Sequence, residues 1–138
     1  MAANIIDGKG VAATVREEVA TEVAAFVGET GVTPGLATVL VGDDPASATY
    51  VRNKRKASAK AGVESLAHEL PATTTQEDLL ALVRQLNEQR DAHGILVQLP
   101  LPPHIDADAV IDAVDPDKDV DGLHPWNQAR LVRGRTGL

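Results

Sequence analysis

Residues 36–62 read LATVLVGDDPASATYVRNKRKASAKAG, and this stretch decides the fold. Its first six residues, 36–41, are apolar and partly β-branched, which is typical of a strand covered on both faces. Asp44 and Pro45 then supply an N-cap and a proline in the first helical turn, so a helix is expected to run to about Gly62. A buried strand followed at once by a helix favours a parallel sheet with crossover helices.

The rest of the chain alternates in the same way. Valines and Phe26 recur every three or four residues between Val11 and Val27, which predicts a long amphipathic helix ending near residues 28–31. Thr74 and Glu77 have the spacing of a capping box and predict the start of a third helix. Short strands are expected at 4–6, 63–68 and 94–98, a brief helix at 106–113, and an irregular polar tail after it.

These elements predict a single α/β domain over residues 1–138. We expect a three-layer α/β/α arrangement around a small, mainly parallel four-stranded sheet. The chain has no cysteine, which excludes disulfides and thiolate metal sites, and its formal net charge is -7. That charge disfavours nucleic acid and anionic membranes as partners. Because the start resembles no signal peptide and no apolar run is long enough to cross a bilayer, a soluble, cytoplasmic protein is expected.

Ser47, Tyr50 and Lys54 form the first candidate constellation. Helical geometry puts all three within an arc of about 60° on one face of the second helix. The Tyr50 ring could cover the Lys54 stem and shield its ammonium from water, which favours the neutral amine needed for proton transfer. The alternative is a half-buried ring beside one more solvated lysine.

The same helix carries further basic residues: Arg52, Arg55, Lys56 and Lys60. They either face solvent and pair with carboxylates, or attract an anionic ligand. Among anionic ligands, nucleic acid is the less favoured, because no aromatic side chains on which bases could stack accompany the basic residues.

The segment 98–102, QLPLP, follows a predicted central strand. Open α/β sheets bind ligands beyond the carboxyl ends of their strands. Prolines would make this loop a rigid apolar wall, and Gln98 would supply an amide that can both donate and accept. The alternative is that the prolines only end the strand.

Asp117, Asp119, Asp121 and Gly122 match the opening of a calcium-binding EF-hand loop. The twelfth position of such a loop would be Gln128 instead of a bidentate glutamate, which disfavours calcium. An acidic loop with one buried, ligand-facing aspartate is the preferred interpretation, and no metal is expected.

Three blocks in order carry a family resemblance. Residues 50–56 read YVRNKRK, residues 97–102 read VQLPLP and residues 118–125 read KDVDGLHP, with VGDDPAS at 41–47 before them. Together they resemble the signature blocks of the bifunctional methylenetetrahydrofolate dehydrogenase/methenyltetrahydrofolate cyclohydrolase family. The resemblance covers the whole chain as the N-terminal, folate-binding catalytic half of that family.

The resemblance implies a role for each candidate residue. Lys54 corresponds to the catalytic lysine, Tyr50 would stack on the folate and hold Lys54, and Gln98 would hydrogen-bond the lysine amine. Asp121 would accept hydrogen bonds from the pterin. The implied substrate-binding set is completed by Ser47, Leu99 and Pro100. The implied reactions are NADP-dependent oxidation of 5,10-methylenetetrahydrofolate and hydrolysis of the product to 10-formyltetrahydrofolate.

The family's NADP-binding Rossmann-type domain is expected to lie outside this chain, since no Gly-x-Gly-x-x-Gly turn occurs in it. The resemblance also implies a cytoplasmic homodimer serving one-carbon metabolism, and with it purine, methionine and histidine biosynthesis. Ala129 stands where the family usually has glycine. The alternative function is a non-catalytic folate-binding α/β module.

Overall fold

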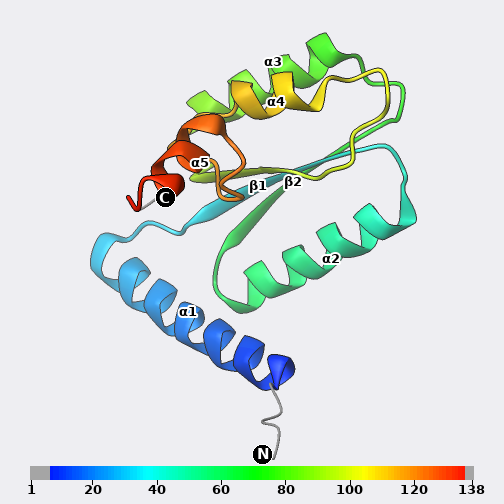
Figure 1. Ribbon diagram of the computed structural model, residues 1–138. Helices are drawn as coiled ribbons and strands as arrows, with labels where there is room; N and C mark the ends of the chain where they lie inside the picture. Colours follow the sequence, from blue (N-terminus) through cyan, green and yellow to red (C-terminus); the bar gives the residue numbers. More distant parts are fainter. Residues whose placement is uncertain (1–6, 136–138) are drawn as a thin grey trace, which may run out of the picture.

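The computed structural model describes residues 7–135 (Figure 1). Its helices and strands alternate along most of the chain. In order they are α1 Gly8–Thr30, β1 Gly35–Val41, α2 Pro45–Lys60, β2 Glu64–Leu70, α3 Gln76–Glu88, β3 Gly94–Val97, α4 Ala107–Ala113 and α5 Pro125–Val132. The strand expected at residues 4–6 lies outside the described residues.

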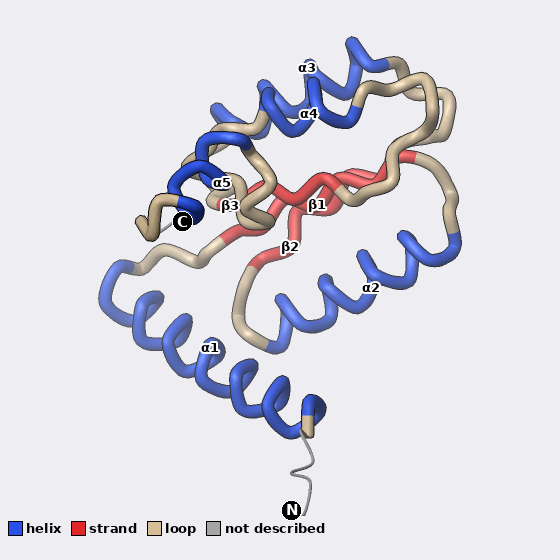
Figure 2. Tube along the Cα trace, in the orientation of Figure 1, coloured by secondary structure: helices blue, strands red, loops and turns tan. Residues whose placement is uncertain are grey.

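The described sheet has three parallel strands in the order β2-β1-β3. α3 and α4 cover one face of this sheet and α2 covers the other, as Figures 1 and 2 show. The expected α/β class and three-layer arrangement are therefore confirmed, with three described strands where four were expected. β1 lies between the other two, which explains why its sequence is apolar without alternation.

The main core fills the space between the sheet and α3. Ala37, Val39 and Val41 alternate along β1 and so point to the same face. They belong to one buried cluster with Leu79 and Val83 of α3. This packing fixes the sheet from which the loops of the candidate site project.

Two local predictions were wrong. The N-cap of α3 is Thr75, whose hydroxyl accepts the Asp78 N–H at 3.1 Å and donates to the Asp78 carboxylate at 2.7 Å. Thr74 donates instead to the Pro71 carbonyl at 2.7 Å. Two adjacent threonines each stand three residues before an acid, so spacing alone could not choose between them.

The chain after α4 is also more regular than expected. An irregular tail was predicted, but α5 forms there with Pro125 in its first turn and His124 as N-cap, whose Nδ1 accepts the Trp126 N–H at 3.1 Å. No helix within residues 7–135 combines the length and apolar character needed to cross a membrane.

Candidate functional site

Lys54 and Gln98 meet at the carboxyl edge of the sheet. The Lys54 ammonium, on α2, donates to the Gln98 Oε1 at 3.4 Å across 44 residues of sequence. Gln98 is itself held in place: its N–H donates to the Val39 carbonyl at 2.8 Å, and its Nε2 donates to the Leu99 carbonyl at 2.8 Å. Both side chains are half-buried. The expected pairing of a lysine amine with an amide is therefore present.

The start of α2 positions Ser47 and Tyr50. Asp44 caps the helix by accepting the Ser47 N–H at 2.7 Å, and this bond, with one from the Ser47 side chain, holds the pKa of Asp44 below its usual range. Ser47 is buried, whereas 63% of Tyr50 is exposed. The ring of Tyr50 is thus an accessible aromatic surface one helical turn before Lys54.

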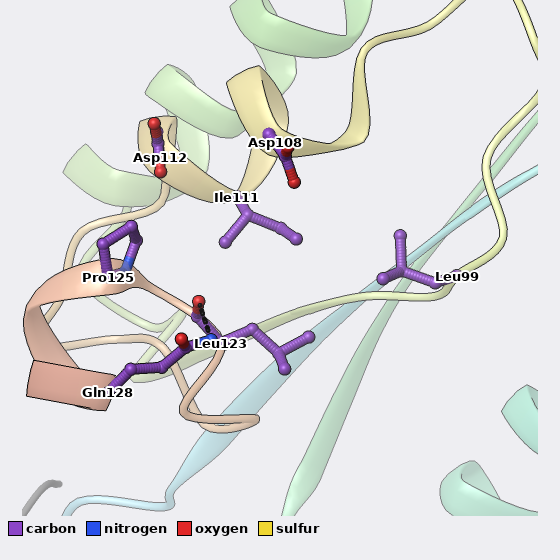
Figure 3. Close-up of a pocket in the computed structure, with 7 residues that line it drawn as sticks. All are labelled: Leu99, Asp108, Ile111, Asp112, Leu123, Pro125 and Gln128. Atoms are coloured by element: carbon purple, nitrogen blue, oxygen red, sulfur yellow. Dashed lines mark hydrogen bonds between the residues drawn. The ribbon is translucent and has the colours of Figure 1, made fainter. Parts of the chain in front are cut away.

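The loop after β3 supplies an apolar wall. The peptide bond between Leu99 and Pro100 is cis. Leu99 lines a groove of about 410 Å³ together with Ile111 of α4 and Leu123, and Figure 3 shows these three side chains facing the same space. Polar groups line it as well: Asp108 and Asp112 of α4, and Gln128, whose Nε2 donates to the Leu123 carbonyl at 2.9 Å. A groove of this size is typical of a small-molecule site.

Asp121 lies beside this groove. Ile111 and Leu123 also line a second, smaller cavity, to which Asp119 and Asp121 contribute carboxylates. Asp121 is exposed, so its oxygens are available to a ligand. The structure therefore links Lys54 through Gln98 and Leu99 to a groove that adjoins Asp121.

The buried aspartate of the acidic loop is Asp119, which is 5% exposed. Its carboxylate accepts the N–H of His124 at 2.8 Å, the N–H of Leu123 at 3.3 Å and the Asn127 amide at 3.0 Å. Burial raises the pKa of Asp119, but the hydrogen bonds from Asn127, His124, Leu123 and Gly122 outweigh that effect and hold the pKa below its usual range. Asp119 therefore shapes the loop that carries Asp121.

The expectation of one aspartate that is both buried and ligand-facing was wrong: Asp119 is the buried one and is held within the loop, whereas Asp121 is exposed. A second missed residue is Lys118, whose ammonium donates to the carbonyls of Leu86 at 3.0 Å and Gln89 at 2.9 Å at the end of α3. A lysine at a helix C-terminus is an ordinary capping device, but α3 lies about 30 residues earlier. Within residues 7–135 no group of three or more His, Cys, Asp or Glu side chains could hold a metal ion.

The arrangement combines complementary chemical groups. An amine paired with an amide oxygen can move protons. An exposed aromatic ring and the apolar side chains of the groove can hold a flat ring system, and carboxylates can accept its N–H groups. Together these groups suit a planar heterocycle that carries several N–H donors.

Comparison with known proteins agrees with this chemistry. Residues 6–121 match the family model described as the tetrahydrofolate dehydrogenase/cyclohydrolase catalytic domain. The chain belongs to this family. Relatives named bifunctional protein FolD, from Magnetococcus marinus and Rhodopseudomonas palustris, are 57% identical over 132 residues and 58% identical over 138 residues. These alignments cover 96% and 100% of the chain but only 46% and 47% of the relatives, so the chain spans about half of their length.

Solved structures of the tetrahydrofolate dehydrogenase/cyclohydrolase family share the fold. A 5,10-methylenetetrahydrofolate dehydrogenase from Bombyx mori superposes with a TM-score of 0.96 at 40% identity, over 99% of this chain and 47% of that one. The Trypanosoma brucei dehydrogenase-cyclohydrolase, solved in complex with NADP cofactor and an inhibitor, gives a TM-score of 0.93 at 45% identity, over 98% and 46% of the two chains.

The departure from the family pattern at Ala129 is accommodated. Ala129 lies within α5, and no residue other than glycine has a positive φ angle in the described part of the chain. An alanine therefore introduces no backbone strain at this position.

Proposed function

We propose that the chain is the folate-binding catalytic domain of a methylenetetrahydrofolate dehydrogenase/methenyltetrahydrofolate cyclohydrolase. The observation that carries this proposal is the hydrogen bond between Lys54 and Gln98, beside a groove with both apolar and polar lining and the Asp121 carboxylate. The substrate would be a tetrahydrofolate whose pterin lies toward Asp121 and whose aromatic linker stacks on Tyr50.

Hydrolysis of 5,10-methenyltetrahydrofolate needs one group that moves protons. Water adds to the carbon between the two nitrogens and loses a proton, and one carbon–nitrogen bond then breaks as its nitrogen gains a proton. The Lys54 amine would take the first proton and deliver the second. Gln98 would orient the amine, since its own position is fixed by Val39 and Leu99.

Oxidation of 5,10-methylenetetrahydrofolate needs NADP as hydride acceptor, and these residues do not fit that cofactor. Pyrophosphate is usually held by a glycine-rich turn and an open helix N-terminus. Within residues 7–135 each helix N-terminus is capped by its own side chain: Asp7, Asp44, Thr75, Asp106 and His124. The proposal is therefore that residues 1–138 form one folate-binding domain and that NADP binds to another domain.

The remaining parts of the proposal concern the cell. The protein would work in the cytoplasm as part of a homodimer, with tetrahydrofolate derivatives as its ligands and without nucleic acid or membrane partners. Its reactions would supply one-carbon units for purine, methionine and histidine biosynthesis. The net charge of -7 supports the absence of polyanionic partners.

The test measures tetrahydrofolate binding by calorimetry and methenyltetrahydrofolate hydrolysis by absorbance. Lys54→Met keeps the apolar stem but removes the amine, so the hydrolysis rate should fall roughly 10²–10⁴-fold, as expected for loss of a general acid–base group. Binding should change much less. Lys9→Met, at an exposed position on α1, is the matched control and should keep the parent rate.

Three outcomes count against the proposal. A Lys54→Met variant with the parent rate would make Lys54 a solvated bystander. Binding without any hydrolysis by the parent chain would favour the non-catalytic folate-binding module. A parent chain that binds no tetrahydrofolate would remove the proposed function altogether.

A further inference from the structure

The loop between β3 and α4 carries Gln98 and Leu99 of the candidate site, and we refer to residues 98–105 as the substrate loop. At its start, the Gln98 N–H donates to the Val39 carbonyl at 2.8 Å. Three of the next five residues are prolines, which have no N–H with which to form a backbone hydrogen bond. The half-buried Leu101 packs against the main core. The position of Leu99 therefore depends strongly on how the far end of the substrate loop is held.

His104 holds the far end of the substrate loop. Its Nε2 lies 2.8 Å from the Thr74 carbonyl oxygen, across 30 residues of sequence. A carbonyl oxygen can only accept, so the imidazole is the donor in this hydrogen bond. Figures 1 and 2 show the loop before α3 and the loop before α4 side by side. The bond therefore fastens the substrate loop to the segment that leads into α3.

Thr74 is a rigid point of attachment. It is buried, and its N–H and its hydroxyl both donate to the Pro71 carbonyl, at 2.9 Å and 2.7 Å. The next residue, Thr75, is the N-cap of α3, and α3 supplies Leu79 and Val83 to the main core. A loop that is fastened to Thr74 is therefore fastened to the core of the domain.

A second side chain reinforces this attachment from the opposite direction. Gln76, in the first turn of α3, accepts the Asp106 N–H with its Oε1 at 2.8 Å. The Asp106 carboxylate in turn caps α4 by accepting the Asp108 N–H at 3.0 Å. Between the two attachments, the Ile105 side chain is buried in the main core. We refer to His104 and Gln76 together as the latch.

We propose that His104, supported by Gln76, is a positioning residue for substrate binding, because it holds Leu99 where the folate packs. The proposal rests on the proposed function and adds a residue that acts through the substrate loop instead of by contact with the substrate. A loop that is already ordered loses less conformational entropy when a ligand binds, so the latch strengthens binding. The proton transfers depend on Lys54 and Gln98, and Gln98 is fixed separately at the start of the loop. Loss of the latch should therefore raise KM and leave kcat nearly unchanged.

The experiment determines KM and kcat for methenyltetrahydrofolate hydrolysis by the parent chain and its variants. His104→Ala removes the donor, so KM should rise roughly three- to tenfold, as for the loss of one ordinary hydrogen bond, while kcat stays within about twofold of the parent value. His104→Gln keeps an N–H donor at the same number of bonds from Cβ and should restore most of the parent KM. Gln76→Ala should raise KM in the same direction as His104→Ala.

His93→Ala is the matched control. His93 also joins two distant segments by one hydrogen bond, since its Nδ1 accepts the Gly35 N–H at 3.0 Å across 58 residues. This bond lies where β1 and β3 begin, whereas Lys54 and Gln98 meet at the opposite, carboxyl edge of the sheet. Both alanine variants should lower the melting temperature by similar amounts, but only His104→Ala should raise KM. A purely structural role of His104 would give the two variants the same kinetic behaviour.

Amide hydrogen exchange tests the latch without folate. The peptide that covers residues 98–106 should exchange faster in His104→Ala than in the parent chain, because the loop opens more often when its far end is released. The same peptide should exchange at the parent rate in His93→Ala. This measurement does not depend on the proposed function.

The outcomes separate this inference from the proposed function. An unchanged KM in His104→Ala, or equal increases in KM in the two alanine variants, would overturn the inference and leave the proposed function standing. A lower kcat at the parent KM would also overturn it, since the latch would then act on proton transfer instead of binding. A parent chain that neither binds nor hydrolyses the folate would count against the proposed function, and unchanged exchange of residues 98–106 in His104→Ala would overturn the latch itself.

Discussion

Asp119→Asn tests whether a buried carboxylate builds the loop of the candidate site. The substitution keeps the shape of the side chain but removes its charge. The asparagine side chain has one acceptor oxygen where the aspartate has two. The 3.3 Å hydrogen bond from the Leu123 N–H is therefore lost, and the NH₂ group of the asparagine faces this N–H. The bonds from His124 and Asn127 remain but become neutral.

The expected cost follows from these three bonds. A hydrogen bond to a charged group contributes about 1.5–3 kcal/mol and a neutral one about 0.5–1.5 kcal/mol. The substitution removes one weak hydrogen bond and turns two charged hydrogen bonds into neutral ones. Since a neutral amide costs less to bury than a carboxylate, the net decrease in the free energy of unfolding should be about 2–3 kcal/mol. For a chain of this length that corresponds to roughly 6–12 °C in the melting temperature.

Urea denaturation followed by Trp126 fluorescence measures this cost, because the single tryptophan lies directly after the loop. Asp117→Asn is the control, since Asp117 is exposed in the same loop and should change the unfolding free energy by less than about 0.5 kcal/mol. Equal unfolding free energies for Asp119→Asn and the parent chain would refute the reasoning.

The pH dependence provides a second check. The pKa of Asp119 is lower in the folded chain than in the unfolded chain, where it is about 3.9. The unfolded state therefore binds the proton first, and the contribution of Asp119 is present above about pH 4 and is lost as the pH falls through the folded pKa. Below about pH 4 the unfolding free energy should fall more steeply for the parent chain than for Asp119→Asn.

Two other predictions concern ligands. Asp121→Ala should weaken tetrahydrofolate binding by roughly 10- to 100-fold, because a hydrogen bond to a charged acceptor is lost. The melting temperature should stay unchanged because Asp121 is exposed. Calorimetry measures the affinity and melting curves the stability, and an unchanged affinity would contradict the placement of the pterin. We expect no NADPH when the 138-residue chain is supplied with 5,10-methylenetetrahydrofolate and NADP, because its described helix N-termini are capped by their own side chains. Measurable NADPH absorbance would show that these residues hold the cofactor after all.

Local sequence signals determined most of the regular structure. The apolar run of β1 and the Asp44–Pro45 start of α2 predicted both elements correctly, because strand burial and helix capping depend on neighbouring residues. The same signals failed where two neighbours were equivalent, as at Thr74 and Thr75. They also failed at α5, where a short helix follows an irregular acidic loop.

The family resemblance predicted which residues form the candidate site and that Lys54 pairs with Gln98, but not the physical cause of that pairing. The two residues are 44 positions apart, and it is the packing of α2 against the sheet that brings their side chains within 3.4 Å of each other. Sequence spacing likewise could not distinguish Asp119 from Asp121, which are two residues apart in an acidic run. The tertiary structure distinguishes them because Asn127 and the N–H groups of Leu123 and His124 surround Asp119, whereas Asp121 stays exposed. A buried carboxylate is stable only where donors from elsewhere in the fold converge on it, and that convergence is a property of the folded chain.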